Sequence, residues 1–154
     1  MPQYNTSSNT SFNRIILIED EVSFRDTIQK YLQKKGYEVT VVGSAGEFFR
    51  EFEQEHFALA IIDVGLPDQN GLALTQYVRS NSLSRVILIT GDSSLDARIK
   101  GYNAGADVFL TKPVSLRLLD AALTSQLMKV AEQNVCQLDM TPFKSLDNAY
   151  SPAW

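Results

Sequence analysis

Polar side chains follow four short apolar runs of this chain, at the points where a strand would give way to a loop. These residues are two acids after the first run, a third acid, a hydroxyl and an ammonium, namely Glu19, Asp20, Asp63, Thr90 and Lys112. In open α/β sheets, the loops at the carboxyl ends of the strands are where ligands bind and chemistry occurs. The chain therefore offers reactive groups at four strand ends.

These residue types suit chemistry on a phosphoryl group. Neighbouring strands lie about 4.8 Å apart, so the side chains can converge. At about 4 Å and an effective dielectric near 20, two carboxylates repel by on the order of 4 kcal/mol, and raised pKa values or a bound cation normally offset such repulsion. All the ligands offered are oxygens, which favour magnesium over zinc or copper. Lys112 could reach an anion beside the metal, and Asp63 could act as a nucleophile.

Each of these features also has a purely structural explanation when it is taken alone. Glu19 and Asp20 could be a solvated strand end, and Asp63 could begin an Asx turn. Thr90 could belong to a turn, and Lys112 could precede a helix with proline near its first position. Their joint occurrence at successive ends of one repeating pattern favours the functional interpretation.

Strands of four to six residues alternate with helix-period segments in five units, which predicts a parallel sheet covered by helices on both faces. Glycine, serine and proline residues mark the helix boundaries. We expect strands over residues 14–18, 38–42, 58–62, 85–89 and 108–110, and helices beginning near Glu21, Ser44, Gly71, Ser93 or Ser94, and Pro113.

Local signals predict details of three helices. Gly36 suits a left-handed cap at the end of the first helix. Ser44-Ala45-Gly46-Glu47 reads as a capping box that opens the second. In the fourth, Leu95, Ile99 and Tyr102 form an apolar face that should pack on the sheet.

Composition limits the classes of protein that this chain can belong to. With 154 residues, 44% of them apolar, it is long enough for one domain. A net charge of −4 without a basic cluster disfavours nucleic-acid binding by this chain alone. The single Cys136 excludes an internal disulfide framework. The chain has no apolar run of membrane-spanning length and no signal-like start, so we expect a cytoplasmic protein that does not bind membranes.

The pattern divides the chain into three parts. We expect a disordered N-terminal segment over residues 1–13, one domain over 14–133, and a C-terminal tail or linker over 134–154, where the helical period fails. The last part is too short to form a helix-turn-helix domain.

Together these motifs resemble the receiver domain of bacterial two-component response regulators, over about 14–132. The motifs that carry the resemblance are Ile18-Glu19-Asp20-Glu21, Ile62-Asp63-Val64-Gly65-Leu66-Pro67-Asp68, Asn70-Gly71, Ile89-Thr90-Gly91 and Leu110-Thr111-Lys112-Pro113. The resemblance implies a flavodoxin-like, doubly wound, five-stranded parallel sheet with strand order 2-1-3-4-5.

The resemblance also implies roles for individual residues. Asp63 would accept a phosphoryl group from a sensor histidine kinase or a histidine phosphotransfer protein. Glu19, Asp20, Asp63 and the backbone carbonyl of Gly65 would hold Mg²⁺. Lys112 would pair with the new phosphoryl oxygens. Such a protein is not an enzyme in the usual sense, because it assists only its own phosphorylation and dephosphorylation.

The resemblance further implies a conformational switch. Thr90 would be drawn to the phosphoryl group, and the ring of Phe109 would turn inward in response. The change would reach the face formed by the fourth predicted helix, the strand 108–110 and the last helix. A homodimer through this face is one expected outcome.

Two other hypotheses stay open on the sequence alone. The first is a phosphatase with an aspartate nucleophile that acts on small phosphomonoesters, although Gly65 stands where such enzymes usually carry their second acid. The second is a flavodoxin-like binding module that no longer accepts phosphate, although the intact set of polar residues argues against it. The sequence also leaves open whether the chain acts alone or as the input domain of a longer transcriptional regulator.

Overall fold

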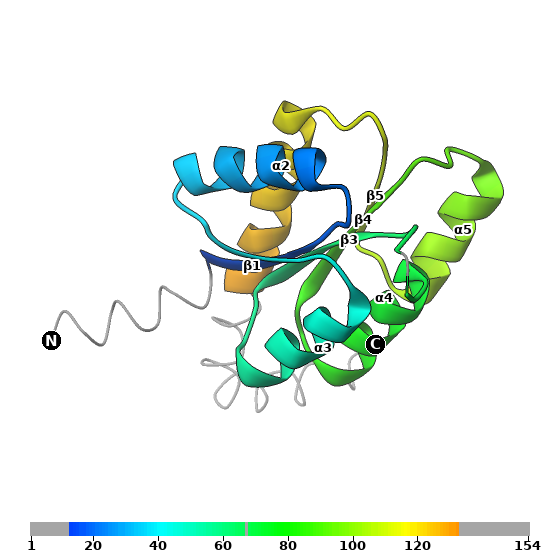
Figure 1. The fold of residues 1–154 in the computed structure, drawn as a ribbon, viewed down its shortest axis with the longest axis horizontal. Helices are drawn as coiled ribbons and strands as arrows, with labels where there is room; N and C mark the ends of the chain where they lie inside the picture. The colour runs from blue at the N-terminus through cyan, green and yellow to red at the C-terminus, as the bar shows by residue number, and fades with distance from the viewer. Residues whose placement is uncertain (1–12, 67, 133–154) are drawn as a thin grey trace, which may run out of the picture.

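A parallel sheet of five strands forms the centre of the part of the chain that the computed structural model describes, residues 13–66 and 68–132 (Figure 1). Its strand order is β2-β1-β3-β4-β5, which confirms the predicted order. The strands are β1 (Arg14–Ile18), β2 (Glu38–Val42), β3 (Leu59–Asp63), β4 (Arg85–Thr90) and β5 (Val108–Thr111).

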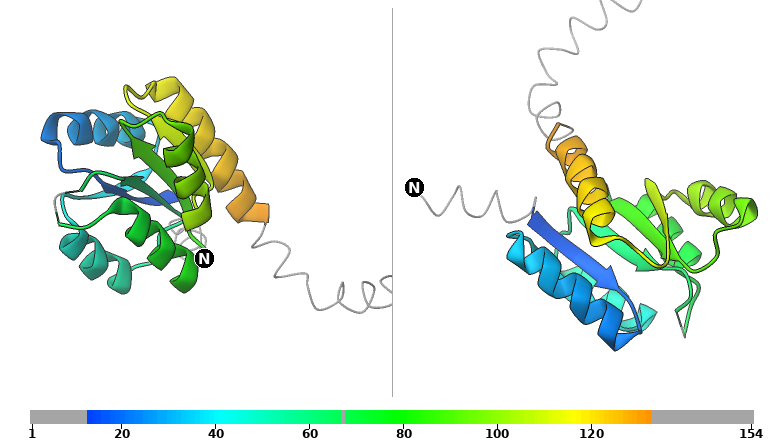
Figure 2. Two further views of the ribbon diagram at one scale, coloured as in Figure 1. Left: turned by 90° about the vertical axis from the view of Figure 1, so that its right-hand side faces the viewer. Right: turned by 90° about the horizontal axis from the view of Figure 1, so that it is seen from above.

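Helices cover both faces of this sheet, as the sequence predicts. They are α2 (Val22–Lys34), α3 (Ala45–Gln54), α4 (Gly71–Asn81), α5 (Leu95–Ala104) and a last helix over residues 116–132. Figure 2 shows α2 and the last helix on one side of the sheet and α3 and α4 on the other. Because each strand is joined to the next through a helix and all strands are parallel, the carboxyl ends of all five strands lie at the same edge of the sheet.

The caps that the sequence predicts are present. The Ser44 hydroxyl accepts a hydrogen bond from the Glu47 amide at 3.3 Å, and the Glu47 carboxylate accepts one from the Gly43 amide at 3.1 Å. Ser94, rather than Ser93, caps α5 by accepting from the amide of Ala97. Gly36 has a φ of 98°, the left-handed conformation expected after α2.

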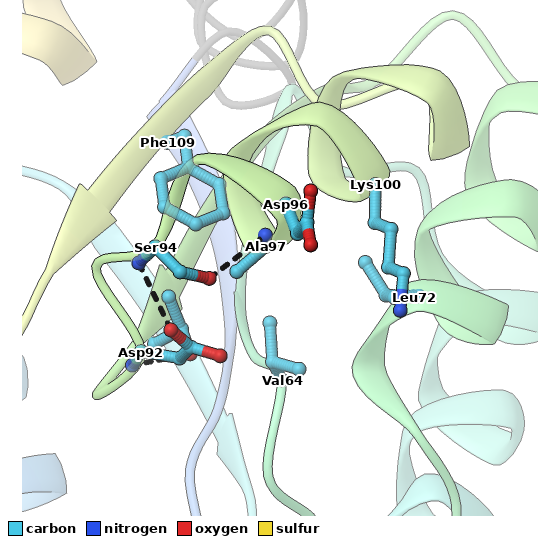
Figure 3. A pocket seen from close by; sticks show the side chains of 9 residues that line it. Val64, Leu72, Asp92, Ser94, Asp96, Ala97, Lys100 and Phe109 are labelled. Atoms are coloured by element: carbon cyan, nitrogen blue, oxygen red, sulfur yellow. Dashed lines mark hydrogen bonds between the residues drawn. The ribbon is translucent and has the colours of Figure 1, made fainter.

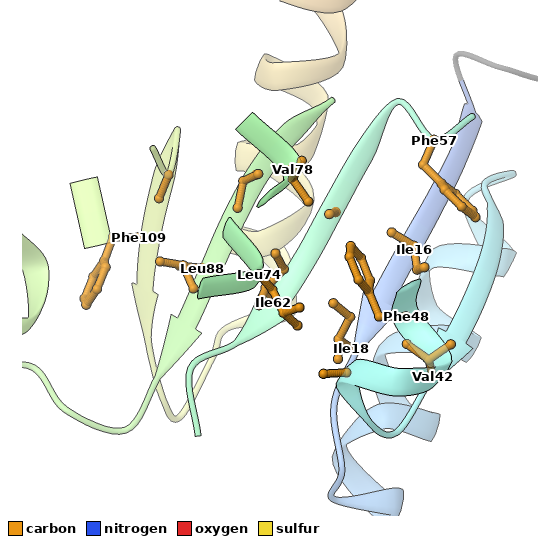
Figure 4. Close-up of a cluster of buried hydrophobic side chains, with 14 residues drawn as sticks. Ile16, Ile18, Val42, Phe48, Phe57, Ile62, Leu74, Val78, Leu88 and Phe109 are labelled. Carbon is orange, nitrogen blue, oxygen red and sulfur yellow. The ribbon is translucent and has the colours of Figure 1, made fainter. Parts of the chain in front are cut away.

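Apolar side chains from the strands fill two cores, one on each face of the sheet. Side chains alternate between the faces along β1, so Ile16 and Ile18 enter one core and Ile15 and Leu17 the other. Figure 4 shows the first core, in which Phe48 and residues of α4 contact the sheet. Burial on both faces explains why the strands read as continuous apolar runs.

The expected packing of α5 is wrong. Leu95, Ile99 and Tyr102 are 71%, 47% and 46% exposed, so this apolar face points away from the sheet. The helix instead packs through small residues, because Gly101 and Ala104 are buried. A Cβ on Gly101 would lie 2.7 Å from the ring of Phe109, so close approach to β5 requires a glycine there.

Two further predictions concern parts of the chain at or beyond the limits of the described residues. The predicted disordered segment 1–13 and the predicted tail or linker 134–154 lie almost entirely outside them, so these domain boundaries stay predictions. Among the described residues, no helix combines the length and the apolar character that crossing a membrane requires.

Candidate functional site

Three carboxylates converge at the carboxyl edge of the sheet. Glu19 follows β1 and Asp63 ends β3, and these two strands are neighbours in which Ile18 pairs with Ile62. One ligand oxygen each from Glu19, Asp20 and Asp63 lies within 4.8 Å of the others. Glu19 and Asp63 are buried, with 1% and 7% exposure, whereas Asp20 is exposed. The trio is therefore anchored in the core and open to solvent on one side.

Lys112 brings its ammonium to these acids from the loop after β5. Its Nζ atom lies 3.2 Å from Glu19 Oε1 and 3.3 Å from Asp63 Oδ2. The backbone amide of Lys112 donates to the Thr90 carbonyl at 2.8 Å, which fixes the loop beside β4. The structure thus brings together four of the residues that the sequence predicts for the site.

Electrostatics in this cluster favour the binding of an additional cation. Burial raises the pKa of Glu19 to about 7, and the nearby charge of Asp63 adds to the effect, although a hydrogen bond from the Glu21 amide and the contact with Lys112 oppose it. Burial lowers the pKa of Lys112, but its hydrogen bond to Glu19 and the charges of Asp63 and Glu19 outweigh this, so the net shift is upward. The upward shift of the Lys112 pKa, and the part of the Glu19 shift that Asp63 causes, reflect the negative charge gathered at this edge.

The donor set fits Mg²⁺. The three converging side chains supply oxygen ligands, the type that Mg²⁺ prefers, and the exposed Asp20 leaves a side open for water or substrate. The Gly65 amide donates to Asp63 Oδ1 at 3.1 Å, so the loop residue expected to supply a carbonyl ligand is tied to the Asp63 carboxylate. The role of the Gly65 carbonyl itself stays a prediction.

The Asn70-Gly71 motif explains how α4 begins so close to Asp63. The Asn70 side chain accepts from the Leu72 amide at 2.8 Å and caps the helix. A Cβ on Gly71 would collide with the backbone oxygen of Asp63, so only glycine allows this approach. The Gly71 amide donates to the Val64 carbonyl at 2.9 Å, which closes the loop after Asp63.

Thr90 and Phe109 lie together beside the acid cluster. Both line a pocket of about 370 Å³ between β4 and α5, and Figure 3 shows Phe109 on one side of it, with Leu72 and Lys100 on the other. The Thr90 hydroxyl accepts from the Asp92 amide at 3.1 Å. The ring of Phe109 is buried against α5, with the Arg98 guanidinium 5.6 Å from its centroid.

Two residues near the site were not assigned to it from the sequence. The ring centroid of Phe24, a residue in the first turn of α2, lies 4.9 Å from Lys112 Nζ. Asp68 accepts from the backbone amides of Ala45 and Gly46 at 3.0 and 3.3 Å, and thereby ties the loop after Asp63 to the start of α3. The sequence signal that could have identified Phe24 is an aromatic residue at the start of the helix that follows the acid pair.

Residues 15–124 match the response regulator receiver domain family. The chain therefore belongs to this family, which confirms the resemblance seen in its motifs. It is 35% identical over 118 residues to the TorCAD operon transcriptional regulatory protein TorR of Escherichia coli (strain K12), an alignment that covers 77% of this chain and 51% of TorR. The chain spans about half the length of the curated relatives it matches.

Solved structures show the same fold. A CheY-like response regulator receiver domain protein from Methanospirillum hungatei JF-1 superposes with a TM-score of 0.74 at 32% identity, covering 79% of this chain and 98% of the other. The solution structure of the beryllofluoride-activated NtrC4 receiver domain dimer gives a TM-score of 0.73 at 27% identity, covering 77% and 98%. Members of this family are regulatory rather than catalytic proteins and act in two-component phosphorelays.

Proposed function

We propose that Asp63 accepts a phosphoryl group from the phosphohistidine of a sensor histidine kinase or a histidine phosphotransfer protein, in a reaction that requires Mg²⁺. The observation that carries this proposal is the convergence of three carboxylates within 4.8 Å, with Lys112 Nζ 3.3 Å from Asp63. Receiver domains take part in this kind of transfer as a family, and the geometry supports Asp63 as the acceptor in this chain.

Each residue of the site has a role in this proposal. Glu19, Asp20, Asp63 and the carbonyl of Gly65 would hold Mg²⁺, which supplies positive charge to the transferring oxygens when it is bound. Lys112 would contact the phosphoryl group once it is attached to Asp63. Since phosphoryl transfer depends mainly on positioning and on neutralising the equatorial oxygens, this set of residues is sufficient.

The bond changes balance without an additional base. A carboxylate oxygen of Asp63 attacks phosphorus in line with the leaving imidazole, so a P–O bond forms as the P–N bond breaks. The imidazole nitrogen keeps the electron pair of the broken bond, and the ring leaves as neutral imidazole because it carries a proton on its other nitrogen or takes one up from water. Asp63 enters the reaction ionised and therefore has no proton to lose. Water later attacks the acyl phosphate and returns Asp63 to its starting state.

Phosphorylation would change the surface formed by α5, β5 and the last helix. It replaces one carboxylate charge with a larger charge and more acceptor oxygens, which favours an arrangement with Thr90 and Lys112 close to the phosphoryl group. Thr90 and Phe109 line the same pocket beside α5, so a movement of the threonine would change the space that the ring can occupy there. The exposed residues Leu95 and Ile99 offer an apolar surface there for a homodimer.

The output of this signal depends on what the chain is joined to. TorR is by its description a transcriptional regulatory protein, and it is about twice as long as the region that matches this chain. We propose that the chain is either a stand-alone receiver or the input domain of such a regulator. The acidic balance of charge, −4 overall, supports an output through protein contacts rather than through DNA contacts of this chain.

The phosphatase hypothesis loses support because the family is regulatory rather than catalytic. Gly65, two residues beyond the acceptor, also has no side chain to act as a general acid. Incubation with a small phosphomonoester such as p-nitrophenyl phosphate should give no sustained release of phosphate. Steady turnover that disappears in Asp63→Asn would restore the hypothesis.

Incubation with Mg²⁺ and acetyl phosphate tests the proposed acceptor. Intact-mass spectrometry should detect one phosphoryl group on the wild-type protein and none on Asp63→Asn. Asp20→Asn should still react, but only at higher Mg²⁺ concentration. Glu53→Gln, an exposed acid of α3 away from the site, should behave as wild type. Phosphorylation of Asp63→Asn at the wild-type rate would remove Asp63 as the acceptor.

A second experiment tests the proposed signalling surface. Sedimentation velocity should show a dimer when Mg²⁺ and beryllofluoride are added, and Ile99→Asp should prevent it while leaving beryllofluoride binding intact. Gln54→Asp, an exposed position at the end of α3 and outside this surface, is the charge control. A monomer under all conditions would exclude a homodimer and leave a different partner for this surface.

A further inference from the structure

Phe24 contacts the ammonium of Lys112 through the face of its ring. The residue lies in the first turn of α2, directly after the loop that carries the acid pair, and its ring centroid is 4.9 Å from Lys112 Nζ. The ring also packs against the core between α2 and the sheet. One aromatic side chain therefore bridges the core and the cation of the site.

The ring and the carboxylates leave the ammonium little freedom. Lysine has a flexible stem of four carbons and is strongly hydrated, so it has no fixed position by itself. Here Glu19 and Asp63 attract Nζ at 3.2 and 3.3 Å. The ring of Phe24 attracts the same charge through its quadrupole and excludes water from that side.

We infer that Phe24 is a positioning residue for the phosphorylation of Asp63, because its ring holds the Lys112 ammonium beside the acceptor oxygen before the phosphoryl group arrives. This inference rests on the proposed function of Asp63. An ammonium that is already in place does not have to be ordered or desolvated during the transfer. In this inference Phe24 acts only through Lys112.

Core packing alone does not account for this residue. The fully buried positions of α2 are Ile28 and Leu32, whereas Phe24 is only partly buried at the edge of the core. If Phe24 served packing alone, leucine would replace it with little consequence for the site. The specific contribution of an aromatic ring is its attraction for a cation, and Lys112 is the cation above its face.

A pair of substitutions separates the two explanations. Phe24→Leu removes the π face and keeps an apolar side chain, and Phe24→Tyr keeps the face. We expect Phe24→Leu to slow phosphorylation by acetyl phosphate about fivefold, from a cation–π contact of ordinary strength, and Phe24→Tyr to keep nearly the wild-type rate. The affinity for Mg²⁺ should not change in either variant. Phe49→Leu, a partly buried aromatic residue of α3, is the matched control and should react as wild type.

NMR provides a readout that core packing would not move. The ring current of Phe24 should shift the Hε resonances of Lys112 upfield in the wild type, and the shift should disappear in Phe24→Leu. In a Lys112→Met background, Phe24→Leu should have no further effect on the reaction rate. If Phe24→Leu does not fold, Phe24→Met replaces it, and the wild-type Hε shift remains a test.

Two results would overturn the inference. The first is equal slowing by Phe24→Leu and Phe24→Tyr, or slowing by neither, while the wild type is phosphorylated on Asp63. The second is an ordinary Hε shift for Lys112 in the wild type. A wild-type protein that takes up no phosphoryl group at Asp63 would instead contradict the proposed function, so the two failures are distinguishable.

Discussion

Clusters of charge lie at both edges of the sheet, and they differ in how their charges are balanced. At the amino edge, Asp107 precedes β5 and accepts from Arg79 and Arg85, each at 3.2 Å. It also accepts from the Val86 amide at 2.8 Å. One acid therefore faces two guanidinium groups and a backbone donor, and both of its oxygens are used.

At the carboxyl edge, the balance is reversed. Three carboxylates lie together there, and the ammonium of Lys112 contacts the two buried ones, Glu19 and Asp63. A divalent cation is the ligand that such an excess of negative charge attracts.

The comparison shows that buried charge by itself does not identify a functional site. A cluster whose donors and acceptors match joins elements of the fold, here α4 to the starts of β4 and β5. In a cluster with unmatched like charges, repulsion raises the free energy of the folded apo protein. Binding of a ligand that supplies the missing charge removes this repulsion and stabilises the folded state. The four predictions below test this difference, from the largest expected effect to the smallest.

The pH dependence of stability should report the repulsion at the carboxyl edge. The pKa of Glu19 is raised from 4.5 to about 7 by burial and by Asp63, so the folded protein keeps a proton there that the unfolded chain loses. Without Mg²⁺, the contribution of Glu19 to the free energy of unfolding should therefore be largest below pH 4.5. It should decrease by about 3 kcal/mol as the pH rises to 7. Urea unfolding of the wild type and Glu19→Gln across this range measures the difference.

Glu19→Gln should remove this part of the pH dependence, because glutamine does not titrate. Binding of Mg²⁺ should show the opposite trend, since the ligand must be deprotonated. Its affinity for the wild type should fall about tenfold between pH 8 and 6, as expected for a ligand pKa near 7. Equal pH profiles for the two proteins would show that Glu19 ionises normally in the folded state.

Asp107→Asn should destabilise the protein by about 2 kcal/mol, because it leaves two guanidinium groups without their carboxylate. The two arginine side chains are only 37% and 19% exposed, so water compensates in part. The stabilisation by Mg²⁺ should be the same as in the wild type. Thermal unfolding with and without Mg²⁺ measures both quantities, and a loss of Mg²⁺ binding would show that the two edges are coupled.

Asp63→Asn should stabilise the apo protein, which is the opposite of the effect expected for Asp107→Asn. Removing this buried carboxylate relieves its repulsion with Glu19, which keeps its own contact with Lys112. We expect the apo protein to gain about 1 kcal/mol, and Mg²⁺ to stabilise the variant much less than the wild type. The pKa of Glu19 should also fall, since the charge of Asp63 helps to raise it. A less stable apo variant would show that attraction to Lys112 outweighs the repulsion.

The sequence predicts most of this fold because the signals are local. The period of the apolar residues predicts the order of strands and helices, and Ser44 and Gly36 mark the helix ends. The convergence of Asp63 with Glu19 follows from the topology, since parallel neighbouring strands end at one edge. The sequence did not decide whether Ser93 or Ser94 caps α5, because the choice depends only on how the preceding loop turns.

Features that depend on packing between distant segments were not predictable in this way. The apolar face of α5 reads as a core face, yet Gly101 brings the opposite side of the helix onto Phe109 and leaves Ile99 exposed. The contact between Phe24 and Lys112 joins residues far apart in the chain, and it depends on how α2 sits over the loop after β5. Sequence patterns report the period of a helix but not which neighbour covers each face.

Asp120→Asn should have the smallest effect, although it also breaks an ion pair. Lys35 Nζ lies 3.8 Å from Asp120 Oδ2, and the two side chains are 50% and 25% exposed. Because water and salt already screen exposed charges, the free energy of unfolding should change by less than about 0.5 kcal/mol, and less still at high salt. Urea unfolding at two salt concentrations measures this. If Asp120→Asn lowered the free energy of unfolding as much as Asp107→Asn, this comparison would be contradicted. An exposed ion pair would then contribute as much to stability as the buried cluster around Asp107.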